Sequence, residues 1–327
     1  MQVENVKNPR TAQSYQPVQP QPAGLLLGYV AMAIAVIAWS LFAVSIRAIS
    51  ASPLSIADVA LFRFGIPALL LLPWLPARLH QLSNLRLREI IAILVGGGVP
   101  YFFIASLGGH LTTAAHVAAL IAGTSPLSVA LLAFVLFRHR VGTTQLRAIL
   151  LILVGVVSMV LPGFSTTMMN GSAMLLLASL LWGGYTLAIR RSGLDTIGCV
   201  LLLSLPSALL LLGLMTTGVV ESHLRSVTLH EMLPFLLIQG LGTGIISSLS
   251  YTVAVQKLGP SRSALIGSLC PALAYLLAVP LLGEHFSLPN VIGVVVITLG
   301  VILANAPFTP YAKGWRQRLV DRCKITR

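Results

Sequence analysis

The chain has little charge for its length. Only 9% of its 327 residues are Asp, Glu, Lys or Arg, whereas 56% are hydrophobic and the mean hydropathy is +0.91. In soluble globular proteins about a quarter of the residues are charged. This composition excludes a soluble enzyme or a soluble binding domain, and it indicates a protein that lies in a membrane.

Cysteine and acidic residues are also scarce. The three cysteines, Cys199, Cys270 and Cys323, have no paired or metal-type spacing, so we expect no disulfide framework, no metal site and no cofactor. None of the eight Asp and Glu falls near the middle of an apolar segment. An intramembrane enzyme would need paired aspartates, a Ser–His pair or a metal cluster there, and neither HExxH nor GxSxG occurs. The sequence therefore predicts no catalytic residues.

Basic residues are in excess, and the formal net charge is +13. They are scattered between apolar segments rather than gathered on one face with aromatic residues, so nucleic acid is not an expected partner. Residues 1–23 are polar and rich in Gln and Pro (QSYQPVQPQP), which predicts a disordered tail. Residues 307–327 form a second tail, which is basic.

Ten apolar segments fill the sequence between the tails. A membrane-spanning helix needs about 20 mostly apolar residues. The predicted spans are 24–46, 56–76, 89–108, 112–136, 145–162, 171–190, 196–217, 231–253, 260–282 and 288–306. The connections between them are too short for a soluble domain. The predicted fold is an all-α polytopic membrane protein with ten transmembrane helices.

The distribution of Lys and Arg supports this number of helices. Ten spans with the N-terminus in the cytoplasm place the connections alternately inside and outside. Of the 21 Lys and Arg, only Arg47 and Arg225 then lie outside, and Arg63 lies within the second span. Cytoplasmic segments of membrane proteins carry an excess of Lys and Arg. We therefore expect both termini in the cytoplasm and the protein in a bacterial cytoplasmic (inner) membrane.

The sequence contains an internal repeat. When the second half is aligned with the first, Pro126 meets Pro271, Gly155 meets Gly300, and AALIAGTSPL meets SALIGSLCPA. Each repeat has five helices, and because five is an odd number, the second repeat is expected to lie upside down relative to the first. Inverted repeats are typical of secondary transporters, in which two halves form a site near the middle of the membrane.

Several motifs resemble those of a known family. DVALFRFGIPALLLLP in the second helix and LLGEHFSLPNVIGVVVITLGVIL near the end of the second repeat are similar to the EamA-type, ten-helix branch of the drug/metabolite transporter superfamily. The resemblance implies two inverted five-helix repeats, at 24–162 and 170–306, and a transport activity. The first repeat departs from the pattern at His139, which stands where the second repeat has Glu284.

Two prolines mark the expected substrate site. Pro126 falls near the centre of the fourth predicted helix and Pro271 near the centre of the ninth. Proline lacks a backbone donor and displaces the carbonyl four residues earlier, here those of Ala122 and Gly267. Paired interruptions at matching positions point to a transporter's binding site. We therefore expect a central cavity flanked by these two helices. The alternative is a pair of bends that serve packing only.

Aromatic residues deep in the predicted helices are candidates for lining this cavity. Trp182 and Tyr185 are favoured, because buried Trp and Tyr need polar partners. The alternative is that they only fill space between helices. In the other repeat Trp39 matches Trp182, and Phe42 matches Tyr185. The weaker candidates of the same kind are Tyr101, Gln239, Tyr251 and Tyr275.

Two charged residues, Arg63 and Glu284, interrupt apolar sequence and are candidates for a gating or a structural role. For Arg63 the simplest interpretation is that the side chain snorkels to the outer interface, since Asp58 is poorly spaced to pair with it along a helix. Glu284 precedes the tenth helix at the outer boundary. We favour a clamp between the last two helices over a proton-sensing gate, because charge at the interface costs less than charge at the membrane centre.

The predicted function is that of a secondary transporter. A cavity without acidic residues favours neutral, zwitterionic or amphipathic solutes. The family resemblance extends this to small metabolites such as amino acids, or to drugs, which are exported by alternating access. The expected partners are the small-molecule substrate and the lipid bilayer, and the chain is expected to be a monomer or a homodimer. A membrane receptor or scaffold that transports nothing is one alternative, and an intramembrane enzyme is another.

Overall fold

A computed structural model describes residues 22–138, 142–161 and 165–305. Throughout these residues the regular structure is helical, without a strand. In the same part of the chain nine helices are long and apolar enough to cross a membrane, from Gly24–Ala51 to Arg262–Leu282, and a shorter apolar helix, Leu288–Ala304, follows them. The all-α polytopic fold predicted from the sequence is confirmed. His139 and most of both predicted tails lie outside the described residues.

The long helices are divided into shorter elements by 3-10 turns, π-helices and breaks. In the first half the elements are α1 (Pro22–Ala48), η1 (Ile49–Ala51), α2 (Ile56–Leu71), η2 (Leu72–Trp74), η3 (Pro76–Arg78), α3 (Leu79–Ser83), α4 (Leu87–Gly97), α5 (Val99–His110), α6 (Ala114–Val117), η4 (Ala118–Gly123), α7 (Ser125–Phe137) and α8 (Thr143–Val160). In the second half they are α9 (Thr166–Ser192), α10 (Thr196–Thr216), α11 (Leu229–Phe235), η5 (Leu236–Ile246), α12 (Ser247–Leu258), α13 (Pro260–Gly267), α14 (Cys270–Leu282) and α15 (Leu288–Asn305). The elements η4 and η5 are π-helices, and η1 to η3 are 3-10 helices.

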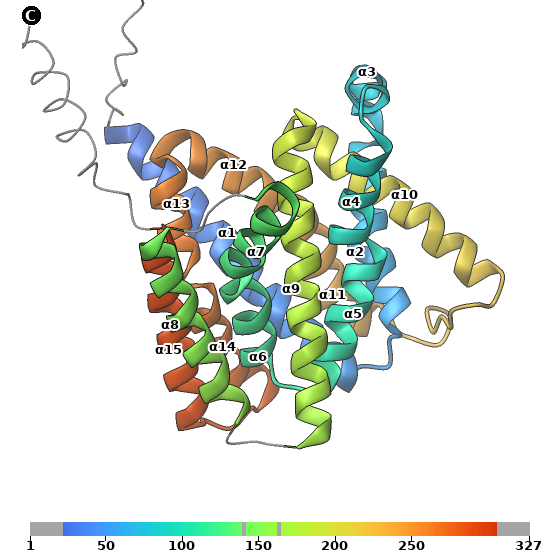
Figure 1. Cartoon of the computed structure of the whole chain (residues 1–327). Coiled ribbons are helices and arrows are strands. Elements are labelled where there is room, and N and C mark those ends of the chain that lie inside the picture. Colours follow the sequence, from blue (N-terminus) through green and yellow to red (C-terminus); the bar gives the residue numbers. More distant parts are fainter. Residues whose placement is uncertain (1–21, 139–141, 162–164, 306–327) are drawn as a thin grey trace, which may run out of the picture.

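The helices cross the molecule in alternating directions (Figure 1). In this view α1 begins at the top, α9 rises through the middle from the bottom, and α15 runs upward at the left. The first residues of α1 and the last residues of α15 therefore lie at the same end of the molecule, as an even number of crossings requires.

Polar residues and glycines set the ends of several helices. Ser55 and Asp58 form a capping box at the start of α2, in which each side chain accepts a hydrogen bond from the other residue's backbone N–H. Asp195 accepts from the N–H of Gly198 at the start of α10. The left-handed φ of 69° at Gly193 and of 65° at Gly283 ends α9 and α14 in a conformation that suits glycine.

The helices α8 and α15 show how the two repeats are related. A Cβ added to Gly155 would lie 2.6 Å from Cγ1 of Ile297, and a Cβ added to Gly300 would lie 2.6 Å from Cγ1 of Ile152. Met159, later in α8, meets the earlier Gly293 of α15, so the two helices run antiparallel. Gly155 is equivalent to Gly300 in the repeats, and Ile152 is equivalent to Ile297. In each of the two contacts, the glycine of one repeat therefore meets the isoleucine of the other. Only a two-fold axis perpendicular to these helices relates them in this way, and the predicted inverted repeat is confirmed.

The other contacts between the halves follow the same symmetry. The helix α1 packs on α12 and α14, while α9, its counterpart in the second repeat, packs on α4 and α7. The helix α2 packs on its own counterpart, α10. These contacts of one repeat therefore have partner contacts in the other, and the two halves are interleaved rather than placed side by side.

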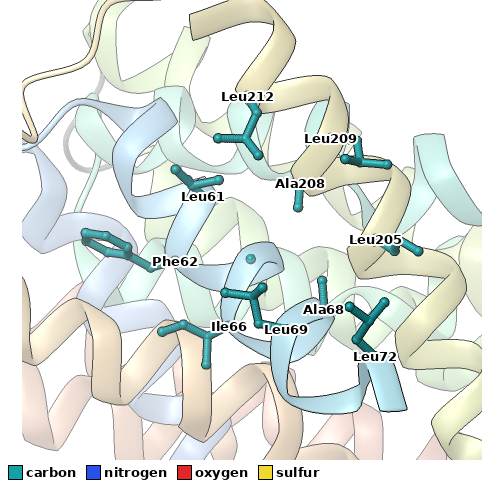
Figure 2. A pocket seen from close by; sticks show the side chains of 11 residues that line it. Leu61, Phe62, Ile66, Ala68, Leu69, Leu72, Leu205, Ala208, Leu209 and Leu212 are labelled. Carbon is teal, nitrogen blue, oxygen red and sulfur yellow. The ribbon is translucent and has the colours of Figure 1, made fainter. Parts of the chain in front are cut away.

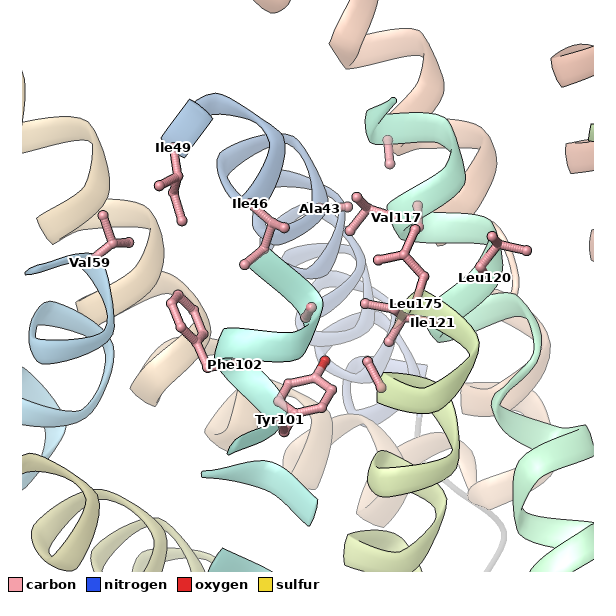
Figure 3. Close-up of a cluster of buried hydrophobic side chains, with 14 of the residues drawn as sticks. Ala43, Ile46, Ile49, Val59, Tyr101, Phe102, Val117, Leu120, Ile121 and Leu175 are labelled. Atoms are coloured by element: carbon pink, nitrogen blue, oxygen red, sulfur yellow. The ribbon is translucent and has the colours of Figure 1, made fainter. Parts of the chain in front are cut away.

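A cluster of buried apolar side chains fills the space between α1, α2, α5, η4 and α9 (Figure 3). Ile46, Phe102, Leu120 and Leu175 are fully buried there. Large apolar side chains are also exposed on the outer faces of most helices. In water such a surface would be unfavourable, but in a bilayer it faces lipid. The polar side chains enclosed by the helices are therefore the places to look for a site.

Candidate functional site

The fourth membrane-spanning helix is interrupted near its middle. The π-helix η4 ends at Gly123, Thr124 lies between the two segments, and α7 begins with Ser125 and Pro126. Pro126 thus occupies the first turn of a new helix, where the missing N–H has no carbonyl to bond in any case. The interruption predicted from the sequence is present here as a boundary between two helical segments. Short π-helical segments occur often at functional sites.

The ninth membrane-spanning helix is interrupted at the matching position. The helix α13 ends at Gly267, and α14 begins at Cys270 with Pro271 in its first turn. The two residues between them, Ser268 and Leu269, form a turn. The paired interruptions predicted from the sequence are therefore present in both repeats, and again the proline begins a helix rather than bending one.

Serine hydroxyls from the first helix of each repeat bind the backbone at these interruptions. Ser179 of α9 donates to the carbonyl of Ile121 at 3.1 Å, and its oxygen lies 2.8 Å from the hydroxyl of Thr124. In the other repeat Ser40 of α1 lies 3.1 Å from the carbonyl of Cys270 and donates to it. Buried carbonyls that leave the regular helix pattern need such partners inside a membrane. In both cases a serine of one repeat bonds the interruption of the other repeat.

The two interruptions meet at the interface between the repeats. The helix α14 packs on the π-helix η4. A Cβ added to Gly123, at the end of η4, would lie 3.8 Å from Cγ of Pro271 and 2.4 Å from Cγ2 of Ile297. Only a residue without a side chain leaves room for this approach. The irregular backbone of both repeats is thus gathered at one place inside the molecule.

Three aromatic rings from α5 and α9 form a row beside this region. The centroid of Trp182 lies 5.4 Å from that of Tyr101 and 4.7 Å from that of Tyr185. Figure 3 shows the Tyr101 ring extending from α5 toward α9. Gly96 and Gly97 of α4 admit the third ring, since a Cβ on either would lie within 3.0 Å of Tyr185 atoms. Three of the residues predicted to line a cavity are therefore in mutual contact.

Trp39, the counterpart of Trp182, forms a second aromatic pair. Its ring centroid lies 5.2 Å from that of Tyr251 on α12. The ring also approaches the end of α13, because a Cβ on Gly267 would lie 3.4 Å from Cζ3 of Trp39. This pair thus lies against the interruption of the ninth span.

Arg63 lies inside the molecule and is only 8% exposed. Its Nη1 donates to Oγ1 of Thr243 at 2.7 Å and to Oε1 of Gln239 at 3.2 Å. Its Cζ lies 4.8 Å from the ring centroid of Phe42. The prediction that this side chain snorkels to the outer interface is wrong, because its polar partners lie on the neighbouring π-helix η5. Asp58 does not pair with it either, since that carboxylate caps α2.

Glu284 joins the loop after α14 to the start of α6. Its Oε1 accepts from the N–H of Ala114 at 2.8 Å and lies 3.9 Å from Nε of Arg47. The predicted clamp between the last two helices is therefore wrong in its partners, because the loop folds over the exposed N–H groups that begin another helix. Burial raises the pKa of the Glu284 carboxyl, although the Ala114 N–H and Arg47 oppose this effect.

Tyr275 has a different environment from the other aromatic candidates. Its hydroxyl donates to the carbonyl of Ser287 at 3.2 Å and accepts from the N–H of the same residue at 2.7 Å. Its ring lies 5.7 Å from that of Phe286. Tyr275 thus holds the hairpin between α14 and α15, and it does not join the row formed by Tyr101, Trp182 and Tyr185.

The polar residues that connect different helices could not be recognised from the sequence. Ser40, Ser179 and Thr243 each bond a residue of another element, but each is one of many Ser and Thr in apolar segments. Most of these others bond only a carbonyl three or four residues earlier in their own helix, as Ser158 does. The one available signal was the repeat itself, since Ser40 and Ser179 both lie on the first helix of a repeat near a matched Trp.

Two apolar grooves lie between pairs of helices. One, of about 320 Å³, lies between α2 and α10 and is lined mainly by leucines such as Leu61, Leu69 and Leu205 (Figure 2). The other lies between α1 and η5 and has Ile37 and Leu237 in its wall. Neither contains a charged residue, and such grooves suit lipid tails. Across the described residues no group of three or more His, Cys, Asp or Glu is placed to hold a metal ion.

Comparison with known proteins places the chain among transporters. The EamA-like transporter family matches residues 26–161 and again residues 169–306. Among solved structures 17 chains match. One of them, titled "Crystal structure of protein", is 19% identical with a TM-score of 0.59, and the match covers 88% of this chain and 99% of that chain. At this identity the likeness shows the fold alone. No curated protein matches the chain.

Proposed function

The chain belongs to the EamA-like transporter family, and from this membership we propose that it exports small organic metabolites, such as amino acids, or drugs, as a secondary transporter. The family consists of transporters rather than enzymes. The apolar helices make the protein an integral membrane protein. We place it in a bacterial cytoplasmic membrane as a monomer or a homodimer, with both termini in the cytoplasm, because nearly all Lys and Arg then lie inside.

The observation that carries this proposal is the pair of interrupted helices. In inverted-repeat transporters the substrate site lies near the membrane midplane. Broken helices there leave backbone N–H and C=O groups free to bind the substrate, whereas a continuous helix uses these groups in its own hydrogen bonds. Here the interruptions at Pro126 and Pro271 occupy matching positions, and they meet between the repeats. Backbone that departs from the regular helix is tolerated at this depth only where protein or a cavity satisfies it. We propose that the solute binds beside these interruptions.

We infer alternating access from the contacts that each repeat makes with the interruption of the other. Ser40 holds the interruption of the ninth span from α1, and Ser179 holds that of the fourth span from α9. A conformation in which one of these contacts is tight and the other loose would face one side of the membrane, and the opposite conformation would face the other side. Exchange between the two would expose the site first to the cytoplasm and then to the outside.

Transport by purified protein in liposomes tests the proposal. Vesicles with the protein, loaded with the twenty common amino acids and a mixture of amphipathic drugs, should release at least one compound faster than vesicles without protein. In cells, expression should lower the internal amount of the same compound and raise the external amount. Higher internal amounts would show that the direction is wrong. If no compound moves although the protein is folded, the receptor or scaffold alternative is favoured.

A further inference from the structure

Arg63 carries a positive charge deep in the membrane-spanning part of the molecule. It is the eighth residue of α2, and at 1.5 Å per residue it lies about 10 Å along the helix from Ile56. A guanidinium remains protonated even when it is buried. Ionised groups at such a depth are rare in membrane proteins and mark functional sites by default, so the partners of this charge need to be identified.

No carboxylate of the described residues 22–138, 142–161 and 165–305 pairs with Arg63. The nearest acid in its own helix, Asp58, accepts from the hydroxyl of Ser222 at 2.7 Å and from the N–H of His223 at 3.0 Å. The ion pairs of this part of the chain involve other basic residues. The faces of three Phe rings partly compensate the charge, at distances from Cζ of 4.8 to 5.8 Å. An anion that would neutralise Arg63 has to come from elsewhere.

One edge of the guanidinium lacks hydrogen-bond partners. Both hydrogen bonds that hold Arg63 use Nη1. Nε is fully enclosed and has no hydrogen-bond partner, and among the described residues none bonds Nη2. The N–H groups of Nε and Nη2 point in the same direction, and they form the fork that binds the two oxygens of a carboxylate. The polar groups of η5 thus fix one side of Arg63 and leave its carboxylate-binding side without a partner.

The neighbouring residues keep this arrangement in place. Nε2 of Gln239 donates to the hydroxyl of Ser45 at 2.7 Å, which turns the amide oxygen of Gln239 toward Arg63. The hydroxyl of Thr243 donates to the backbone carbonyl of Gln239 at 2.9 Å, so its lone pairs face the guanidinium. Gln239 and Thr243 lie on the π-helix η5, four residues apart. They act as positioning residues for Arg63.

Arg63 lies next to the helix that carries the first of the aromatic rings. Its Cζ is 5.8 Å from the ring centroid of Phe102, and Phe102 follows Tyr101 in α5. Trp182 lies between Tyr101 and Tyr185. Arg63 and the aromatic row therefore form one neighbourhood. Its chemistry combines one fixed cation with aromatic faces.

We propose that the Nε–Nη2 edge of Arg63 binds the carboxylate of the transported solute, and that Tyr101, Trp182 and Tyr185 hold the rest of the molecule. This inference rests on the proposed transport function and names its substrate class: amphipathic carboxylates and zwitterions of one carboxylate, amino acids included. The aromatic faces accept an apolar group or a cationic amino group by stacking. Neutral drugs and cations without a carboxylate are poor substrates. The same contact neutralises Arg63 while the solute is bound.

Ligand-induced stabilisation of the purified protein tests this proposal. The probes are benzoate, benzamide, the twenty L-amino acids and the amides of those that bind, and the readout is the melting temperature in detergent. Benzoate or an amino acid should raise the melting temperature, whereas the matching amide should not. R63K keeps the charge but not the fork, and it should weaken carboxylate binding by about tenfold or more. R63Q should abolish it.

Two control variants separate binding from folding. R225Q removes one exterior positive charge, and it should bind carboxylates like the wild type. T243V removes one hydrogen bond to Nη1 but leaves the fork intact, so it should lower the melting temperature and weaken carboxylate binding less than R63K does. The proposal is overturned if R63K and R63Q bind carboxylates as the wild type does. It is also overturned if amides bind as well as carboxylates, or if no carboxylate of the panel binds.

A parallel efflux assay keeps this inference distinct from the transport proposal. If wild-type vesicles release only neutral or cationic compounds, and R63Q vesicles do the same, the transport function stands and the carboxylate site is wrong. If the protein binds carboxylates through Arg63 but wild-type vesicles release none of the panel, the carboxylate site stands and the transport function is wrong.

Discussion

Replacing Gly155 with Ala should loosen the crossing of α8 and α15 and destabilise the fold. The new Cβ would lie 2.6 Å from Cγ1 of Ile297, 2.9 Å from its backbone N and 3.0 Å from the carbonyl oxygen of Gly293. Carbon atoms in contact prefer separations of about 3.5–4.0 Å. Two of the three close atoms belong to backbone, so the helices themselves have to move apart. Overpacking of this kind costs about 1–3 kcal/mol.

The matched control is G213A. An added Cβ at Gly213 meets no atom within 4 Å, and the residue lies within α10. Ala favours a helix over Gly by up to about 1 kcal/mol, so this variant should be neutral or slightly more stable than the wild type. The repeat symmetry adds a second expectation. G300A places its Cβ 2.6 Å from Cγ1 of Ile152 and 3.0 Å from its backbone N, so its effect should match that of G155A.

The free energy of unfolding in mixed detergent micelles, measured by titration with a denaturing detergent, gives these differences directly. We expect G155A and G300A to lose similar amounts, and each to differ from G213A by about 1–3 kcal/mol, because the helix propensity of the new Ala is common to all three variants. If G155A is as stable as G213A, the close approach of the two helices is refuted. If only one of G155A and G300A is destabilised, the equivalence of the two contacts is refuted.

Three further outcomes are expected. Because the pKa of Glu284 is raised, the ionised form of this carboxyl is disfavoured in the folded protein. The melting temperature of the wild type relative to E284Q should therefore be highest below about pH 4.5 and fall as the pH rises past the raised pKa. A difference that grows with pH would contradict this. Y185A should impair efflux from liposomes while Y29A, on an exposed face, should not, and equal efflux would remove Tyr185 from the site. S179A should destabilise the protein by about 1–3 kcal/mol in the same titration, because the Ile121 carbonyl loses a donor, and an unchanged stability would show that this bond is dispensable.

The positions of the helices could be predicted from the sequence because they depend on local composition. A long run of apolar residues forms a membrane-spanning helix in a bilayer, because the helix satisfies its own backbone hydrogen bonds. The predicted spans agree with the observed helices to within a few residues at most ends. The paired prolines at positions 126 and 271 were recognisable for the same reason, since a proline affects the backbone wherever it stands.

The partners of the charged residues could not be predicted, because they come from helices distant in the sequence. Arg63 bonds Thr243, which lies on the π-helix η5. No residue pattern in the sequence predicts that this segment is π-helical, so the direction of the Thr243 side chain could not be predicted either. Glu284 stands between α14 and α15 in the sequence, which favours a contact with those helices, whereas its partner, Ala114, begins a helix of the other repeat. Tyr275 lies deep in an apolar segment like the other aromatic candidates, but its hydroxyl bonds the hairpin next to it.

The tight crossing of α8 and α15 limits how the two halves of the transporter can move. Ile297 fits against Gly155 and Ile152 against Gly300, with backbone close to backbone at both points. Sliding one helix along the other would drive each isoleucine into the main chain of its neighbour. Tilting about the crossing itself keeps both contacts nearly in place. If the halves rock during transport, this crossing is the pivot, and the largest displacements belong to α4 and α10 on the opposite side of the molecule (Figure 1).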